Sequence, residues 1–146
     1  MEIVNRKARF EYQILQKYEA GIMLTGPEVK SLRAGKANMT DAWCLFDQKG
    51  NLLIKNLHIS EYQHAMDPQD PKRTRRLLLH KSELRKIERR SREKGYSIIP
   101  LRIFFSETGY AKCEIALAQG KKAYDKRESI KQKDISRDLD RIKRIR

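Results

Sequence analysis

The sequence contains few of the residues that stabilise small secreted domains or bind metals. Its two cysteines, Cys44 and Cys113, lie far apart in apolar stretches without a C-x-x-C motif, and its three histidines have no paired ligand spacing. This pattern predicts reduced cysteines in a hydrophobic core and argues against a disulfide or zinc framework. No apolar run approaches the roughly 20 residues that span a bilayer, and the first residues do not resemble a signal peptide. We therefore expect a cytoplasmic protein that has no membrane partner.

Sequence motifs of catalysis are missing as well. The chain has no G-x-x-x-x-G-K-[ST] phosphate loop, no H-E-x-x-H helix and no G-x-S-x-G turn. Two function classes remain: an RNA-binding factor and, as the alternative, a metal-independent nuclease acting through His58, His64 or His80. A protein of the membrane surface is a third reading, which the absence of Trp and Phe from the basic segments disfavours.

Positive charge is what the sequence has in excess. Lysine and arginine number 33 against 19 acidic residues, which gives a formal net charge of +14 and a pI near 10.0. Residues 72–94 contain 11 Lys/Arg and 3 Asp/Glu, residues 121–146 contain 11 and 5, and the remainder of the chain contains 11 of each. The whole excess therefore belongs to two blocks on a neutral body. This distribution favours two contact surfaces for a polyanion, with nucleic acid as the first choice.

The hydrophobic pattern predicts a mainly β fold with short helices. Five segments read as strands: residues 10–25, 42–46, 51–59, 99–105 and 111–117. A two-turn helix should begin at Pro27, another should cover 82–94 and end at Gly95, and 60–74 should be an irregular loop. This order is compatible with an OB-fold-like antiparallel barrel over residues 1–120, followed by a basic C-terminal tail over 121–146. A generic α+β sandwich would give much the same pattern.

The last predicted hairpin carries specific expectations for single residues. Pro100 lacks an N–H group and should therefore lie at a strand edge or a bulge. One face of the first strand should present Ile99, Leu101, Ile103 and Phe105. The core face of its partner should present Ala111, Cys113, Ile115 and Leu117, which places Lys112 on the outward face.

The helix after Pro27 is too short to be stable without tertiary contacts. We expect Val29 and Leu32 to dock on the sheet. Lys30 and Arg33 are candidates for RNA contacts, or for ion pairs with Glu28 or another acid.

The tail, residues 121–146, contains no glycine or proline and repeats aliphatic residues at helical spacing. Its acids lie early and its last cations late, which is the polarity that a helix dipole favours. Because the aliphatic residues are isolated, two readings stay open: a solvated terminal helix, or a segment that becomes helical only on a partner.

Four stretches resemble motifs of the SmpB family, the tmRNA-binding (SsrA-binding) proteins of bacterial ribosome rescue. In the family's order they are NRKARFEY, YEAGIMLTGPEVKSLRAGKANMTDAW, RTRRLLLHKSEL and GKKAYDKRESIKQKD. The sequence departs from the family pattern at Pro27 and in the loop AMDPQDPK. The resemblance implies an OB-fold protein without catalytic activity or a cofactor. Such a protein binds the tRNA-like domain of tmRNA, replaces its missing anticodon arm and helps deliver it to stalled ribosomes.

The resemblance also implies partners: tmRNA, the small-subunit rRNA near the decoding centre of a stalled ribosome, and EF-Tu with GTP through the tmRNA complex. The free protein is expected to be a monomer. A ribosomal or general RNA-binding OB-fold protein is the alternative.

Site residues follow from the same motifs. Those expected to contact tmRNA, or to support such contacts, are Asn5, Glu19, Leu78, Lys112, Gly120 and Lys121. Those expected to act in the tail, which in the family enters the vacant mRNA channel and becomes helical there, are Asp125, Lys126, Arg127, Ile135, Leu139, Arg141, Ile142, Lys143 and Arg144. For Leu78, the alternative interpretation is a position in the hydrophobic core. For Glu19, two roles are possible: it accepts hydrogen bonds from base or ribose donors, or it orients a nearby cation.

Overall fold

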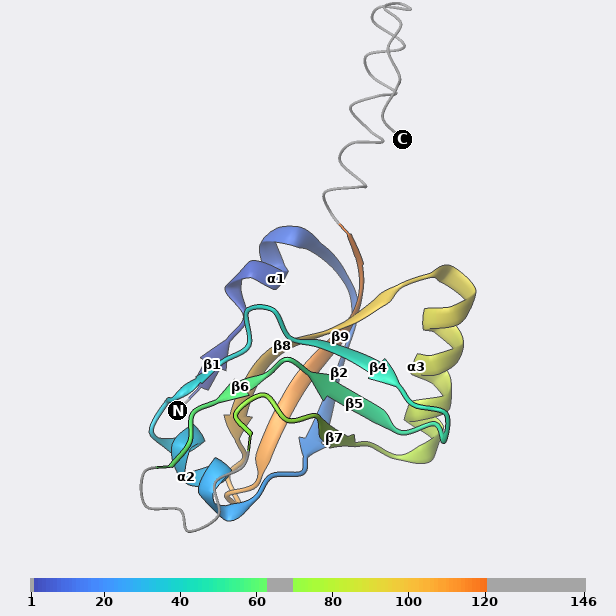
Figure 1. Cartoon of the computed structure of the whole chain (residues 1–146). Helices are drawn as coiled ribbons and strands as arrows, with labels where there is room; N and C mark the ends of the chain where they lie inside the picture. The colour runs from blue at the N-terminus through green and yellow to red at the C-terminus, as the bar shows by residue number, and fades with distance from the viewer. Residues whose placement is uncertain (1, 63–69, 121–146) are drawn as a thin grey trace, which may run out of the picture.

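A ring of antiparallel strands closes into a barrel in the computed structural model, which describes residues 2–62 and 70–120 (Figure 1). The strands pair in the order β8–β4–β5–β7–β2–β9, and β9 pairs in turn with β8. β1 adds to β8, and β3 and β6 form a separate short ladder. The strands are β1 (Glu2–Val4), β2 (Tyr12–Ile22), β3 (Ala37–Asn38), β4 (Trp43–Phe46), β5 (Leu52–Lys55), β6 (His58–Ile59), β7 (Arg75–Leu78), β8 (Ser97–Phe105) and β9 (Ala111–Gly120). The described helices are α1 (Arg6–Glu11), α2 (Gly26–Arg33) and α3 (Lys81–Lys94).

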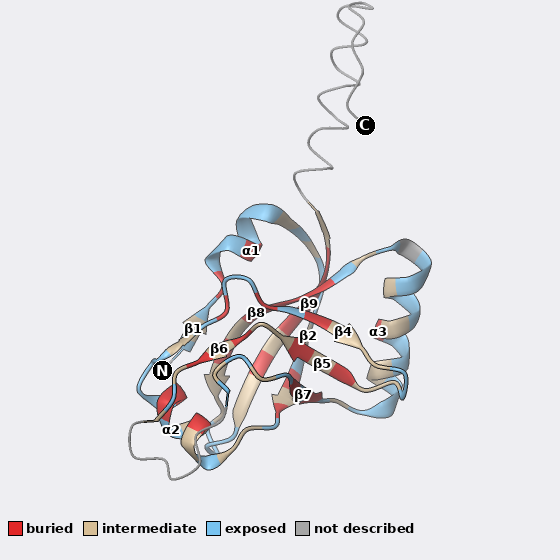
Figure 2. Ribbon diagram, viewed as in Figure 1, coloured by how far each residue is buried: buried red, intermediate tan, exposed pale blue. Residues whose placement is uncertain are grey.

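Apolar side chains from every strand of the ring fill the barrel, where Figure 2 shows the buried residues. Leu32 of α2 and Ile87 of α3, both fully buried, join this core from two sides. A second, smaller cluster lies on the outer face of β8 and β9 beneath α1; it contains Ala8, Ile99, Leu101, Ala116 and Ala118. The predicted fold class, a mainly β, OB-fold-like barrel with short helices, is confirmed.

The hairpin β8–β9 confirms one expectation and corrects another. The register of β8 shifts between Pro100 and Arg102, so Pro100 lies at a bulge as predicted. The extra residue reverses the alternation of side chains along β8. Ile103 therefore faces the barrel core, whereas Ile99 and Leu101 lie in the outer cluster, and the expectation of one shared face is wrong. The unbulged partner β9 places Cys113, Ile115 and Leu117 in the core as expected.

The N-terminal segment differs from the predicted strand. Residues 10 and 11 end α1, and β2 begins only at Tyr12 and ends at Ile22. Asn5 caps α1 by accepting a hydrogen bond from the Ala8 backbone N–H at 3.2 Å. The helix was not predicted because it is short and charged and buries a single residue, Ala8, so that it has no apolar period.

Helix α2 begins with a capping box between Thr25 and Glu28. Leu32 docks in the core as expected, and Val29 is half-buried. Neither Lys30 nor Arg33 pairs with Glu28, which corrects that expectation. The Lys30 ammonium lies 5.3 Å from the centroid of the Tyr62 ring, and the Arg33 guanidinium lies 4.3 Å from that of Phe105.

Glu28 instead lies in a buried ion cluster with Arg73 and Arg75, each at 2.7 Å. Burial by itself would raise the pKa of Glu28, but hydrogen bonds from Arg73, Arg75 and the Thr25 backbone hold that pKa below its ordinary value. Arg75, which is also buried, donates further to the backbone oxygens of Leu57 and Pro71 at 2.7 and 3.0 Å. This cluster ties α2 to the segment that leads into β7.

Among the remaining elements, β1, β3 and β7 were not predicted as strands, whereas the turn after β4 and helix α3 follow the prediction. Gly50 and Gly95 adopt positive φ at the turn between β4 and β5 and at the end of α3. The predicted strand 51–59 is interrupted, because Asn56 has a φ of 62° and separates β5 from β6. Ile87 is buried and Leu84 half-buried on the inner face of α3.

Both cysteines are buried and form no disulfide, as predicted. Burial raises the pKa of Cys113 to about 12 and raises the pKa of Cys44 well above its ordinary value. Both thiols are therefore protonated at neutral pH.

Much of the predicted loop 60–74, including His64 and Asp67, and the whole tail 121–146 lie outside the described residues. Within residues 2–62 and 70–120, none of the helices has the length and hydrophobicity needed to cross a membrane.

Candidate nucleic-acid interface

An open pocket of about 430 Å³ collects three of the residues expected to contact RNA. Glu19, Leu78 and Lys112 come from three different strands, and strand pairing brings them together. Gly21 of β2 pairs with Leu78 of β7 on one side and with Lys112 of β9 on the other. The lining residues of this site, the Leu78 pocket, are Glu19, Gly21, Leu78, Leu79, His80, Glu83 and Lys112.

Leu78 points out of the barrel and into this pocket. It is 46% exposed, whereas its neighbour Leu77 is 1% exposed in the core. Gly21 lies against Leu78, since a Cβ atom there would be 3.4 Å from the Leu78 Cβ, in ordinary van der Waals contact. The alternative of a core position for Leu78 is therefore excluded, and an apolar side chain faces solvent beside two charged ones.

Two opposite charges in the Leu78 pocket are available to a ligand. Within the described residues, Glu19 and Lys112 form no ion pair and no side-chain hydrogen bond. Glu114, which pairs in register with Glu19, is by contrast held by Arg102 at 3.3 Å. Lys112 can donate to a phosphate, the Glu19 carboxylate can accept from a base or a ribose hydroxyl, and Leu78 can contact the face of a base.

Asn5 does not line the Leu78 pocket. Its side chain is 4% exposed and donates to the Pro100 carbonyl at 2.9 Å while it accepts from Ala8. Its own backbone N–H donates to the Leu101 carbonyl at 2.8 Å. Asn5 thus fixes α1 on the bulged part of β8, and any role in RNA binding would be to position α1.

Gly120 lies at the far end of the β2–β9 pair from this pocket. It pairs with Tyr12 at the start of β2, whereas Lys112 pairs with Gly21 near its end. Eight residues of an extended strand span about 26 Å. A ligand that contacts both the Leu78 pocket and the region of Gly120 must therefore span about 26 Å.

The other predicted site residues lie outside the described residues: Lys121, Asp125, Lys126, Arg127, Ile135, Leu139, Arg141, Ile142, Lys143 and Arg144. Their assignment stays a prediction.

The sequence analysis named His80 only for the nuclease alternative and did not name Glu83, and both residues line the Leu78 pocket. The His80 backbone N–H donates to the Glu83 carboxylate at 3.3 Å, so both belong to the start of α3. No pattern in the sequence signalled that these two residues line the pocket. Of the three histidines of the nuclease alternative, His80 lines the Leu78 pocket, His58 lines a separate pocket, and His64 lies outside the described residues.

These features define a class: an OB-like barrel with an adjoining basic helix, α3, a fold whose strand faces and loops commonly bind nucleic acid. Comparison with known proteins agrees. A model of the family described as "SmpB protein" matches residues 2–145. The chain is 54% identical to the SsrA-binding protein of Cytophaga hutchinsonii, over 98% of this chain and 94% of that protein. It is 51% identical to that of Desulforamulus reducens, over 97% and 88%.

A solved structure described as "tmRNA-SmpB: a journey to the center of the bacterial ribosome" is also similar. It matches with a TM-score of 0.71 and 47% identity, over 92% of this chain and 94% of that one. This chain belongs to the SmpB family.

Proposed function

We propose that the protein binds tmRNA and acts in trans-translation, where it presents the tRNA-like domain of tmRNA to stalled ribosomes. The observation that carries this proposal is the Leu78 pocket, in which strand register assembles Glu19, Leu78 and Lys112 on the outside of the barrel. Membership of the SmpB family and the similarity to a tmRNA–SmpB structure support it.

In this proposal the Leu78 pocket reads RNA by shape. A splayed loop base contacts Leu78, Glu19 accepts hydrogen bonds from a base or ribose, and Lys112 binds a phosphate of the same loop. Asn5 supports the contact surface through α1, and Gly120 and Lys121 bind the RNA at the other end of β9. The barrel then occupies the place of the missing anticodon arm.

The tail has a separate role in the proposal. Residues 121–146 enter the vacant mRNA channel near the decoding centre, where Asp125, Lys126 and Arg127 begin the ribosome-acting segment. Ile135, Leu139 and Ile142 then form the apolar side of a helix, whose last cations, Arg141, Lys143 and Arg144, contact rRNA. The protein works in the cytoplasm as a monomer without a cofactor or catalytic activity, and EF-Tu with GTP joins through tmRNA.

The decisive experiment compares affinity for the isolated tRNA-like domain of tmRNA with affinity for an ordinary tRNA. We expect clear preference for the former; equal affinities would favour the alternative of a general RNA-binding OB-fold protein.

A truncation after Gly120 separates the two roles. We expect the shortened protein to retain much of its tmRNA affinity and to lose peptide tagging on stalled ribosomes. Full tagging activity of the truncated protein would contradict a role for the tail. RNA turnover by the purified protein that disappears on substitution of His58, His64 or His80 would support the nuclease alternative.

A further inference from the structure

Two carboxylates lie side by side on the outer face of β2 and β9. Glu19 and Glu114 are directly opposite each other in register, and Lys112 is two residues from Glu114 on the same face of β9. Directly opposite side chains have Cβ atoms about 5 Å apart, and residues at i and i+2 are about 7 Å apart along a strand. By spacing alone, the Glu114 carboxylate is within reach of the Lys112 ammonium, so an ion pair between them would be expected.

Glu114 pairs with Arg102 instead. The Arg102 Nε donates to the Glu114 Oε1 at 3.3 Å, and its Nη1 donates to the Glu2 Oε2 at 2.7 Å. The guanidinium also lies over the Phe104 ring, 4.1 Å from the centroid. These three contacts, made with β1, β8 and β9, hold a planar cation in one orientation, and its side chain is 30% exposed.

We propose that Arg102 is a positioning residue for RNA binding, because its hold on Glu114 leaves Lys112 unpaired and available to a phosphate. Arg102 does not itself line the Leu78 pocket. It acts through Glu114, whose charge it neutralises, and it thereby removes both a competitor for Lys112 and a source of repulsion for the bound phosphate. The inference rests on the proposed function, since it concerns the same RNA site.

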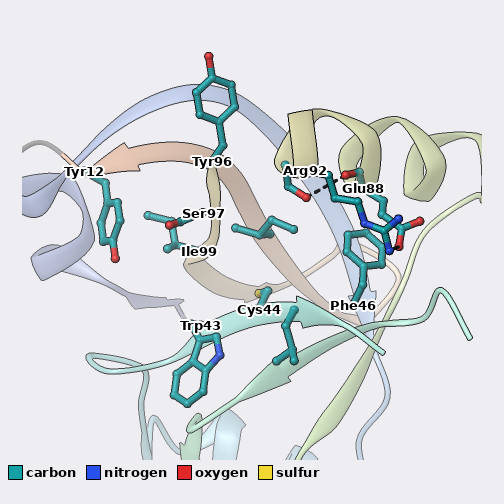
Figure 3. A pocket seen from close by; sticks show the side chains of 12 residues that line it. Tyr12, Trp43, Cys44, Phe46, Glu88, Arg92, Tyr96, Ser97 and Ile99 are labelled. Atoms are coloured by element: carbon teal, nitrogen blue, oxygen red, sulfur yellow. Dashed lines mark hydrogen bonds and ion pairs between the residues drawn. The ribbon is translucent and has the colours of Figure 1, made fainter. Parts of the chain in front are cut away.

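The surroundings of Arg102 differ from those of an ordinary surface ion pair. The pair Glu88–Arg92, drawn in Figure 3, links two residues one turn apart on α3 at 3.0 Å, and its arginine is 76% exposed. Breaking such a pair leaves a solvated carboxylate on the same helix and costs little. Loss of Arg102 would instead leave a carboxylate, Glu114, that is 19% exposed and lies opposite another acid, Glu19. Like charges directly opposite each other are unfavourable, so the released carboxylate should recruit the neighbouring lysine of its own strand.

The test measures the affinity of the full-length protein for the isolated tRNA-like domain of tmRNA. Arg102→Ala should weaken binding by about five-fold, because the released Glu114 competes with phosphate for Lys112. Glu114→Gln alone should bind no more weakly than the unaltered protein. The double variant Arg102→Ala/Glu114→Gln should recover the affinity to within about two-fold, because no carboxylate is left to compete for the lysine.

Further variants separate this role from other roles of Arg102. Glu2→Gln breaks its second ion pair, which ties β1 to β8, and should leave the affinity unchanged because β1 is two strands away from Lys112. Arg102→Lys keeps a cation next to Glu114 and should bind like the unaltered protein. In a Lys112→Ala background, Arg102→Ala should cost less than about two-fold, because the cation that it protects is missing.

Two results would overturn the inference. If Arg102→Ala binds like the unaltered protein, Arg102 does not influence the site. If the double variant stays as weak as Arg102→Ala, Arg102 contacts RNA directly or supports only the fold. Should Arg102→Ala fail to fold, as judged by urea unfolding, Arg102→Gln replaces it in the same comparison. Failure of the proposed function gives a different result, since the unaltered protein would then bind the tRNA-like domain and an ordinary tRNA equally.

Discussion

Two groups of charged residues in this protein have similar chemistry and opposite surroundings. Glu28, Arg73 and Arg75 form a cluster in which the carboxylate and one guanidinium are buried and every charge has a partner within 2.7 Å. Glu19 and Lys112 lie in the Leu78 pocket and, among the described residues, have no ionic partner.

The contrast separates charges that hold the fold from charges that can bind a ligand. A buried carboxylate is tolerated only with its partners in place, so the Glu28 cluster makes α2 and the start of β7 interdependent. An exposed, unpaired ion contributes little to stability and is free to exchange water for a phosphate or a base. Substitutions in the first group should therefore change stability, and those in the second should change affinity.

The largest effect is expected for Glu28→Gln. The substitution leaves Arg75 charged and buried without its carboxylate, which should lower the free energy of unfolding by about 3–5 kcal/mol. Urea unfolding monitored by circular dichroism measures it. Glu107→Gln, in the exposed turn between β8 and β9, is the matched control and should stay within about 0.5 kcal/mol of wild type. Equal stability of the two variants would show that the ion cluster does not hold α2 in place.

Acid should weaken the same cluster. Because the pKa of Glu28 in the folded protein lies below its ordinary value of 4.5, its stabilisation is complete above that value and is lost as the pH falls through the lowered pKa. The difference in unfolding free energy between wild type and Glu28→Gln should therefore shrink from about pH 5 towards about pH 3. Glu107→Gln, which removes a carboxylate from the exposed turn between β8 and β9, controls for general acid effects. A difference that stays constant with pH would exclude ionised Glu28 as the cause.

The barrel was predictable from sequence where alternation is uninterrupted, as in β9, where Cys113, Ile115 and Leu117 share the core face. The barrel was less predictable where a bulge changes which face of a strand the side chains occupy. The missing N–H of Pro100 indicated a bulge, but only the register shows that the bulge sends Ile99 and Ile103 to opposite faces. Helix α1 depends on the cap at Asn5 and on tertiary contacts, for which hydrophobic periodicity carries no signal.

The residues of the Leu78 pocket could be predicted from sequence, but their proximity in space could not. The resemblance to family motifs named Glu19, Leu78 and Lys112 as site residues. Glu19 and Lys112 are 93 positions apart in the sequence. These residues lie close together in space because β2 pairs with both β7 and β9. Such long-range strand pairing cannot be predicted from local sequence patterns. Glu28 shows the converse, since its partners Arg73 and Arg75 belong to a block that sequence reasoning assigned to RNA contact.

A smaller effect, on affinity alone, is expected for Lys112→Ala. Loss of one charge-assisted phosphate contact should weaken binding of the tRNA-like domain by about ten-fold, and the slope of log affinity against log salt should fall by about 0.7–0.9. Filter binding or anisotropy over a range of salt concentrations measures both quantities. Lys49→Ala, in the exposed turn between β4 and β5, should alter neither by a comparable amount. An unchanged salt slope for Lys112→Ala would mean that this lysine does not contact a phosphate.

The smallest effect is expected for Leu78→Ala, which tests whether the pocket uses an apolar contact in addition to charge. Covering a half-exposed leucine with a base contributes about 1 kcal/mol, so affinity for the tRNA-like domain should fall about five-fold with an unchanged salt slope. Leu15→Ala is the matched control: Leu15 is 41% exposed on β2 and does not line the pocket. Both variants should unfold at similar urea concentrations, because neither side chain is in the core. If the two leucines affect RNA affinity equally, Leu78 is an ordinary surface residue, and the unpaired charges alone distinguish the pocket from the Glu28 cluster.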